Sequence, residues 1–150
     1  MENQVTKQPA ILVVEPDPLM LTAIAAVLDS RGYRCFLARD VAVASQATDQ
    51  MQFDLIVLSL GEDLSAATQA AQRLRGKQQT EGLPVIFIAP RLHPEWIGPL
   101  NAAGGVSCLS SPFEPETLLD LVDKAVWMPH LAVAKLAPPP AHFEKSWVRL

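Results

Sequence analysis

The chain has 150 residues, of which 49% are hydrophobic, and its formal net charge is −4. This length suits one domain that buries roughly two thirds of its unfolded surface, and a negative chain offers no basic field to a nucleic acid. The first ten residues lack the basic start and apolar run of a signal peptide, and the longest uncharged stretch, residues 96–113, is interrupted by glycines and prolines. We therefore expect a cytoplasmic protein that binds neither nucleic acid nor membrane.

Strand and helix patterns alternate along the chain. Short aliphatic runs predict strands of a parallel sheet covered on both faces, at residues 11–14, 33–38, 53–58, 84–89 and 106–109. Apolar residues at helical spacing predict helices at residues 18–28, 41–51, 64–74 and 114–128, and the prolines within residues 93–105 predict a short or broken helix. Asp17, followed by Pro18, and Asp40 are expected to be helix N-caps. Five such units predict an α/β fold, a three-layer α/β/α sandwich.

The carboxyl ends of the strands are where such a sheet meets its ligands. That rule selects the residues that end or follow the predicted strands: Glu15, Asp17, Ser59, Ala89, Pro90 and Ser111.

Four segments in order, ILVVEPDP, FDLIVLSL, LPVIFIAP and GGVSCLSSPFEPETLL, resemble the receiver domain of bacterial two-component response regulators over about residues 9–128. The resemblance implies a flavodoxin-like fold with a five-stranded parallel sheet of order 2-1-3-4-5, and a place in phosphorelay signal transduction. Active receivers accept a phosphoryl group from a histidine kinase on an aspartate that ends the third strand. Magnesium is held there by that aspartate and by an acidic pair after the first strand, because the ion prefers hard oxygen ligands.

At the positions that carry this chemistry, the resemblance places other residue types. The acidic pair falls on Glu15 and Pro16, and the phosphoacceptor position falls on Ser59. The positions of the hydroxyl residue, the lysine and the aromatic switch fall on Ala89, Ser111 and Cys108. A serine cannot form the acyl phosphate, and these motifs contain no histidine or lysine to activate its hydroxyl. We therefore expect a degenerate pseudo-receiver without a magnesium cofactor or enzymatic activity.

Each polar residue also has a structural interpretation. Glu15 is expected to be a solvated acid at a strand end, Asp17 an N-cap rather than a ligand, and Ser59 a small residue that the strand end tolerates. Ser111 is expected to keep the turn into the last helix, where the family has a cis peptide before Pro112.

Trp96, Cys108 and Trp127 form the candidate partner surface. The resemblance places them near the face of the fourth helix, fifth strand and fifth helix, where receivers commonly dimerise or meet partners, and aromatic residues make good anchors. Core packing is nevertheless favoured for both tryptophans. The resemblance also places Cys35 and Cys108 on opposite edge strands, about four strand spacings or roughly 19 Å apart, which is too far for a disulfide.

The composition changes after Met128, and we place the receiver-like domain at 9–128 and a proline-rich tail at 129–150. The run Pro138-Pro139-Pro140 predicts a stiff spacer. A loosely ordered tail is favoured over a docking peptide for the residues that follow.

These observations favour a binding module that acts through phosphorylation-independent contact with a signalling protein, which could be a histidine kinase, another regulator or an effector. A homodimer through the face of the fourth helix, fifth strand and fifth helix is one form of this function. The alternatives are a small flavodoxin-like domain with ligand-binding or enzymatic activity, and a receiver modified at Ser59. The first alternative lacks a glycine-rich phosphate loop and a recognisable pair of nucleophile and base.

Overall fold

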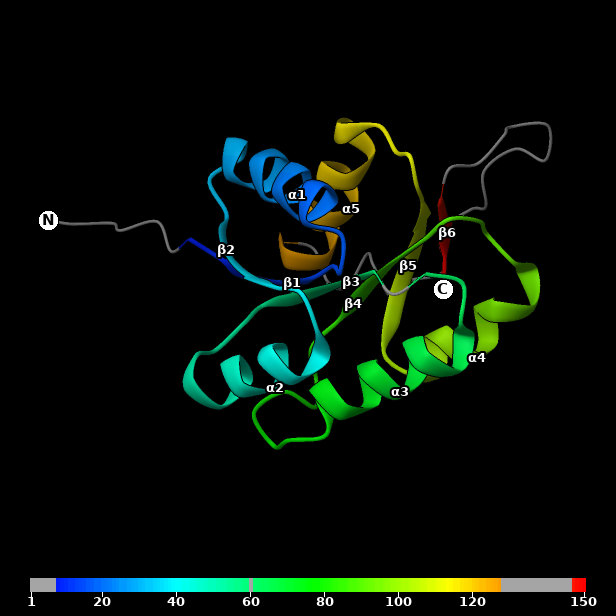
Figure 1. Ribbon diagram of the computed structural model, residues 1–150, viewed down its shortest axis with the longest axis horizontal. Coiled ribbons are helices and arrows are strands. Elements are labelled where there is room, and N and C mark those ends of the chain that lie inside the picture. Colours follow the sequence, from blue (N-terminus) through cyan, green and yellow to red (C-terminus); the bar gives the residue numbers. More distant parts are fainter. Residues whose placement is uncertain (1–7, 60, 128–146) are drawn as a thin grey trace, which may run out of the picture.

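The computed structural model describes residues 8–59, 61–127 and 147–150, and it places one sheet between two layers of helices (Figure 1). The strands are β1 (Ala10–Val14), β2 (Arg34–Ala38), β3 (Leu55–Ser59), β4 (Val85–Ala89), β5 (Gly105–Ser110) and β6 (Trp147–Arg149). The helices are α1 (Pro18–Ser30), α2 (Val41–Gln50), α3 (Leu64–Arg75), α4 (Ile97–Ala102) and α5 (Pro115–Trp127), with a short 3₁₀ turn (Pro94–Trp96) before α4.

The strand order is β2-β1-β3-β4-β5-β6. Strands β1 to β5 pair in parallel, in the order that the resemblance implies, so the predicted α/β/α architecture is confirmed. The sheet differs from the prediction in one respect, because β6 pairs antiparallel with β5. Part of the predicted tail therefore forms a strand, and β5 is an inner strand instead of an edge. Residues 129–146 of the tail lie outside the described residues.

In the part of the chain that the structure describes, the core forms two clusters, one on each face of the sheet. Ile11 and Val13 point toward α1 and α5, whereas Leu12 and Val14 point toward α2, α3 and α4. Figure 1 shows these two helical layers on opposite sides of the strands. Because both faces are covered, the strands in the middle of the sheet are apolar along nearly their whole length.

Aspartates begin three helices. Asp17 and Asp40 accept hydrogen bonds from the Leu19 and Val43 amides, which confirms both predicted N-caps. Asp63 does the same for α3 through the Ala66 amide. These caps fix where the chain leaves the carboxyl ends of β1, β2 and β3, and so they shape the loops at that edge of the sheet.

Among the described residues, no helix is long and apolar enough to cross a membrane.

Candidate functional site

The structure brings together the residues that were selected at the carboxyl ends of the strands. Val14 lies opposite Leu58, so Glu15 and Ser59 end neighbouring strands in register. Ala89 lies opposite Ser110, and the Ser111 amide donates to the Ala89 carbonyl at 2.9 Å. One edge of the sheet therefore carries the first, third, fourth and fifth strand ends side by side.

Glu15 is buried, with 6% of its surface exposed, which corrects the expectation of a solvated acid. Its Oε2 accepts a hydrogen bond from the Asp17 amide at 2.8 Å, and its own amide donates to the Ala38 carbonyl at 3.0 Å. The backbone after β1 turns back over the side chain, and the carboxylate completes this turn. A buried acid needs such a partner, because an unpaired buried charge is costly.

Asp17 and Pro16 occupy the outer part of the same turn. The Asp17 Oδ1 accepts from the Leu19 amide at 3.1 Å, so this carboxylate also serves the backbone. The Pro16 carbonyl accepts from Arg39 Nε at 3.4 Å. Pro16 has no side-chain oxygen, and it therefore adds only a carbonyl to the site.

The remaining strand ends are small and weakly polar. Ser59 and Ala89 are buried, whereas Ser111 is half-buried, and the Ser111–Pro112 peptide is cis as expected. Within residues 8–59, 61–127 and 147–150, no group of three or more histidine, cysteine, aspartate or glutamate side chains is arranged to hold a metal ion.

A charged cluster that sequence reasoning missed links the loops after β3 and β4. The His93 Nε2 lies 3.5 Å from Glu62 Oε1, and Arg91 Nη2 lies 3.8 Å from Glu62 Oε2. The His93 ring also stacks on Trp96, with 4.3 Å between ring centroids. No motif in the sequence pairs these residues, and they meet only because β3 and β4 are neighbours.

The three residues of the candidate partner surface have separate surroundings. Trp96 is partly buried and packs against the core on the α2, α3 and α4 side, in agreement with core packing. Cys108 is 3% exposed, so its side chain is not available to a partner. Trp127 is 55% exposed, which corrects the expectation of core packing, and its Nε1 donates to the Tyr33 hydroxyl at 3.0 Å. Because Tyr33 directly precedes β2, this tryptophan lies on the α1 side of α5, away from α4.

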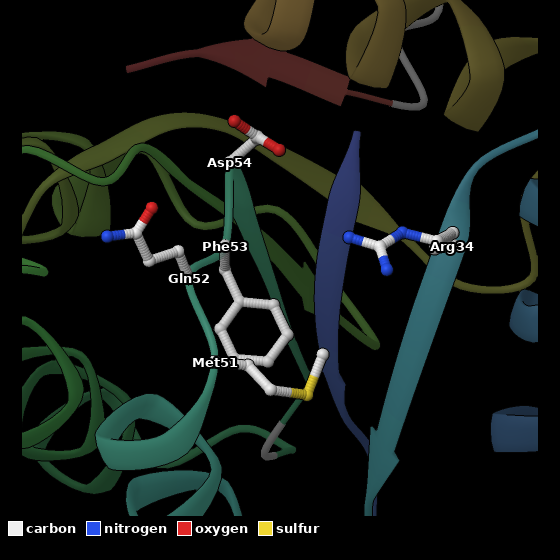
Figure 2. Close-up of a pocket in the computed structure, with 5 residues that line it drawn as sticks. All are labelled: Arg34, Met51, Gln52, Phe53 and Asp54. Atoms are coloured by element: carbon white, nitrogen blue, oxygen red, sulfur yellow. The ribbon is translucent and has the colours of Figure 1, made fainter. Parts of the chain in front are cut away.

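A recess of about 340 Å³ lies at the opposite edge of the sheet, before β2 and β3, and its lining residues are Arg34, Met51, Gln52, Phe53 and Asp54 (Figure 2). The Asp54 Oδ2 accepts from the Ala10 amide at 2.9 Å and thereby fixes the start of β1. The recess brings together the starts of only two strands, whereas the carboxyl ends of four strands meet at the other edge of the sheet. The recess is therefore the weaker candidate, because ligands of such sheets bind at the carboxyl ends of the strands.

The sequence model of the response regulator receiver domain matches residues 11–123. The chain belongs to this family. Receiver domains interact with signalling proteins such as kinases and effectors, and they are generally signalling domains rather than enzymes.

The curated relatives of this receiver are described as probable transcriptional regulators. One is the probable transcriptional regulator ycf29 of Porphyra purpurea, which is 26% identical over 118 residues, or 78% of this chain and 56% of that protein. Its counterpart in Pyropia yezoensis is 25% identical over 117 residues, or 77% of this chain and 52% of that protein. The chain thus spans about half the length of these relatives.

Solved receivers share the fold. The chemotaxis response regulator CheY4 of Vibrio cholerae aligns with a TM-score of 0.72 and 22% identity, over 79% of this chain and 99% of that one. The receiver domain of a Pseudomonas aeruginosa sensor histidine kinase, solved with magnesium coordinated in its active-site cleft, aligns with a TM-score of 0.66 and 24% identity, over 81% and 99% of the two chains. At these identities the likeness establishes the flavodoxin-like fold alone.

Proposed function

We propose that this receiver acts in two-component signalling through protein contacts that do not depend on phosphorylation. The observation that carries the proposal is the residue at the end of β3. Ser59 is buried there, in register with Glu15 at the end of β1, at the position where the family resemblance places the phosphoacceptor aspartate.

The neighbouring strand ends lack the groups that would respond to a phosphoryl group. Ala89 has no hydroxyl to hydrogen-bond phosphoryl oxygens, and Ser111 carries no positive charge to pair with them. A phosphate on Ser59 would be an ester rather than an acyl phosphate, and it would meet neither of the two groups on which the family's response depends. These residues fit a module that is not an enzyme and whose state is set by its partners.

The residues at this edge also do not fit a magnesium ion. The Glu15 carboxylate accepts from the Asp17 amide and the Asp17 carboxylate accepts from the Leu19 amide, so both acids already serve the backbone. Pro16 supplies no carboxylate, and the Ser59 hydroxyl is a neutral ligand where magnesium sites use charged oxygens. The proposed function therefore requires no metal ion.

The test is binding of beryllofluoride, which imitates a phosphoryl group on a receiver, in the presence of magnesium. We expect no saturable shift in the melting temperature of the wild-type chain. A matched variant that combines Pro16→Asp, Ser59→Asp and Ser111→Lys restores the second acid, the acceptor carboxylate and the lysine, and serves as the positive control. Beryllofluoride at about one hundred times its dissociation constant should raise the free energy of unfolding of that variant by about 2.7 kcal/mol.

Saturable binding by the wild-type chain would contradict the proposal. A separate outcome addresses modification at Ser59: transfer of labelled phosphate from a partner kinase, abolished by Ser59→Ala, would establish Ser59 as an acceptor in place of the proposed function. The control for that experiment is Ser110→Ala, which removes a hydroxyl from β5 and leaves Ser59 unchanged.

The partner that suits this proposal is another signalling protein: a histidine kinase, a second regulator or an effector. The curated relatives are probable transcriptional regulators of about twice the matched length. By this likeness, the partner contacts of the chain would belong to a pathway that controls transcription. A homodimer through α4, β5 and α5 is a further form of the same function, although β6 covers the outer side of β5.

A further inference from the structure

The outer side of β5 is filled by a short strand from the C-terminal part of the chain. Residues 147–149 run antiparallel to β5, with Val148 opposite Cys108 and Trp147 opposite Leu109. The Leu150 amide continues the ladder by donating to the Val106 carbonyl at 3.1 Å. Figure 1 shows β6 beside β5 at the end of the sheet. Without β6, the backbone groups along this side of β5 would be open to pairing with another strand.

The side chains of residues 147–150 fit this edge in alternation. Val148 and Leu150 pack against the core cluster on the α2, α3 and α4 side, while Trp147 packs against the cluster on the α1 and α5 side. The edge has a matching space for Leu150, because a Cβ on Gly105 would lie only 2.5 Å from Leu150 Cδ1. Alternate side chains of a strand point to opposite faces of the sheet, so this edge selects aliphatic residues at every second position.

The contact is short enough to be reversible. The strand has three residues, and all four residues of the segment 147–150 remain half-buried. Residues 128–146 join the segment to α5, which makes the contact intramolecular. A contact within one chain needs no second molecule, so a weak strand contact can stay closed until a competitor arrives.

We propose that the outer edge of β5 is a strand-binding site which residues 147–150 occupy within the same chain. The partner that it fits is an extended peptide segment with aliphatic residues at alternate positions, which pairs antiparallel with β5 and must displace β6. Main-chain hydrogen bonds would supply affinity and the alternate side chains would supply specificity, as in other complexes formed by strand addition. This strand-binding site rests on the proposed function, because it would be a surface through which that function acts. Its test measures only peptide binding, and the test of the proposed function measures only beryllofluoride binding, so the failure of one is distinguishable from the failure of the other.

The test compares the full-length wild-type chain with the full-length variant Val148→Asp, which places a charge against the apolar cluster and so releases β6. The probe is a fluorescein-labelled peptide of residues 145–150, and the measurement is its fluorescence anisotropy. We expect saturable binding to the variant and binding to the wild-type chain that is weaker by roughly tenfold or more, because the tethered strand competes for the edge.

Two controls match this comparison. A peptide that itself carries Val148→Asp should bind neither chain, and the full-length variant Arg149→Gln, altered on the other face of the strand, should behave as the wild type does. The proposal is overturned if the peptide fails to bind the Val148→Asp chain or if it binds both chains equally. A wild-type dimer that Val148→Asp converts to monomer would also overturn it, because the segment would then occupy the edge of a second copy.

Amide hydrogen exchange keeps the proposal testable if Val148→Asp is poorly folded. In that case Leu150→Asp, at the end of the segment, takes its place. Exchange at residues 106–109 should be faster in this variant than in the wild type by roughly tenfold, while exchange in β1 and β3 stays unchanged. Equal exchange at residues 106–109 in the two chains would overturn the assignment of residues 147–150 to this edge.

Discussion

Glu15 and Asp17 show how two neighbouring carboxylates can be engaged by a turn instead of a metal ion. Glu15 accepts from the amide of Asp17, and Asp17 accepts from the amide of Leu19. Hydrogen bonds from amides to carboxylates are among the stronger ones in proteins. The two acids therefore stabilise the passage from β1 to α1, and the role of Asp17 is testable.

Replacing Asp17 tests whether it is a cap or a ligand. Asp17→Ala should lower the free energy of unfolding by about 1 kcal/mol, because it leaves the Leu19 amide without its acceptor. Asp17→Asn keeps an acceptor oxygen and should change stability by only a few tenths of a kcal/mol. Urea unfolding measures both, with and without millimolar magnesium. A stabilisation by magnesium that Asp17→Ala abolishes would identify Asp17 as a ligand and contradict the prediction.

The sequence predicted the role of Asp17 and not that of Glu15. An aspartate followed by a proline at the start of an apolar helical pattern is a local signal, and the cap that it forms involves only nearby residues. The burial of Glu15 depends on the backbone turning over it and on β2, whose Ala38 carbonyl accepts the Glu15 amide. That pairing exists only once β1 and β2 lie side by side, so local pattern could not reveal it.

At the scale of elements, strands in the middle of the sheet were the most predictable. The aliphatic runs at β1, β3 and β4 place each strand within two residues of its observed bounds, because burial on both faces leaves a continuous pattern. The prolines before β5 correctly predicted a short helix, and α4 spans six residues. In contrast, β6 has three residues and pairs with a strand far earlier in the chain, so its pattern is too short to identify it.

Sequence patterns also could not predict the contacts that long polar side chains make between elements. Arg75, at the end of α3, donates to the carbonyls of Leu83 and Ala103 at 2.7 and 3.3 Å and so ties α3 to the starts of β4 and β5. Gly104, with φ of +100°, leaves room for this guanidinium, because a Cβ there would lie 2.3 Å from Arg75 Nη1. Only the fold shows which side chain lies against this glycine.

Tyr33 joins α5 to the turn between α1 and β2, which makes a prediction at this scale. Its hydroxyl donates to the Asp123 carboxylate and accepts from Trp127 Nε1, and Arg31 pairs with the same carboxylate. Tyr33→Phe should lower the free energy of unfolding by about 1.5–3 kcal/mol, because a hydrogen bond to a charged group is lost. Urea unfolding monitored by circular dichroism measures the change.

Two substitutions on α5 control the Tyr33 prediction. Asp123→Asn should also destabilise the fold, whereas Asp120→Asn, on an exposed position of the same helix, should change stability by no more than about 0.5 kcal/mol.

Burial, and then the hydrogen bond to Asp123, raise the pKa of the Tyr33 hydroxyl well above its ordinary value. Tyr33 is the single tyrosine of the chain, so tyrosinate absorbance should appear in alkali only with unfolding. Tyrosinate formation in the folded chain would contradict this account of the hydroxyl.

The whole molecule carries one thiol in each core cluster. Cys35 on β2 packs toward α1 and α5, and Cys108 on β5 packs toward α2, α3 and α4. Both are free, and β1, β3 and β4 separate their strands, as the sequence interpretation required. Burial raises the pKa of each thiol from 9.0 to about 11, and the nearby Asp29 charge adds to the effect at Cys35. The two thiols therefore report on both layers of the sandwich.

Alkaline pH should destabilise the folded chain through these thiols. A raised pKa means that the folded state keeps its thiol protons while the unfolded chain loses them near pH 9, so stability is full below pH 9 and falls as the pH rises toward 11. For the buried Cys108, the loss between about pH 8 and pH 10.5 should be about 2 kcal/mol. Urea unfolding at a series of pH values measures this slope.

The control for the alkaline prediction compares slopes rather than absolute stabilities. Cys108→Ala leaves a small cavity and so lowers stability at every pH, but it should flatten the decline above pH 9, because the thiol that titrates differently in the two states is gone. Lysine and tyrosine ionisation is common to both chains and cancels in the comparison. An unchanged slope in Cys108→Ala would mean that the unfolded and folded chains bind the Cys108 proton equally, and that the α2, α3 and α4 layer admits water to the strand beneath it.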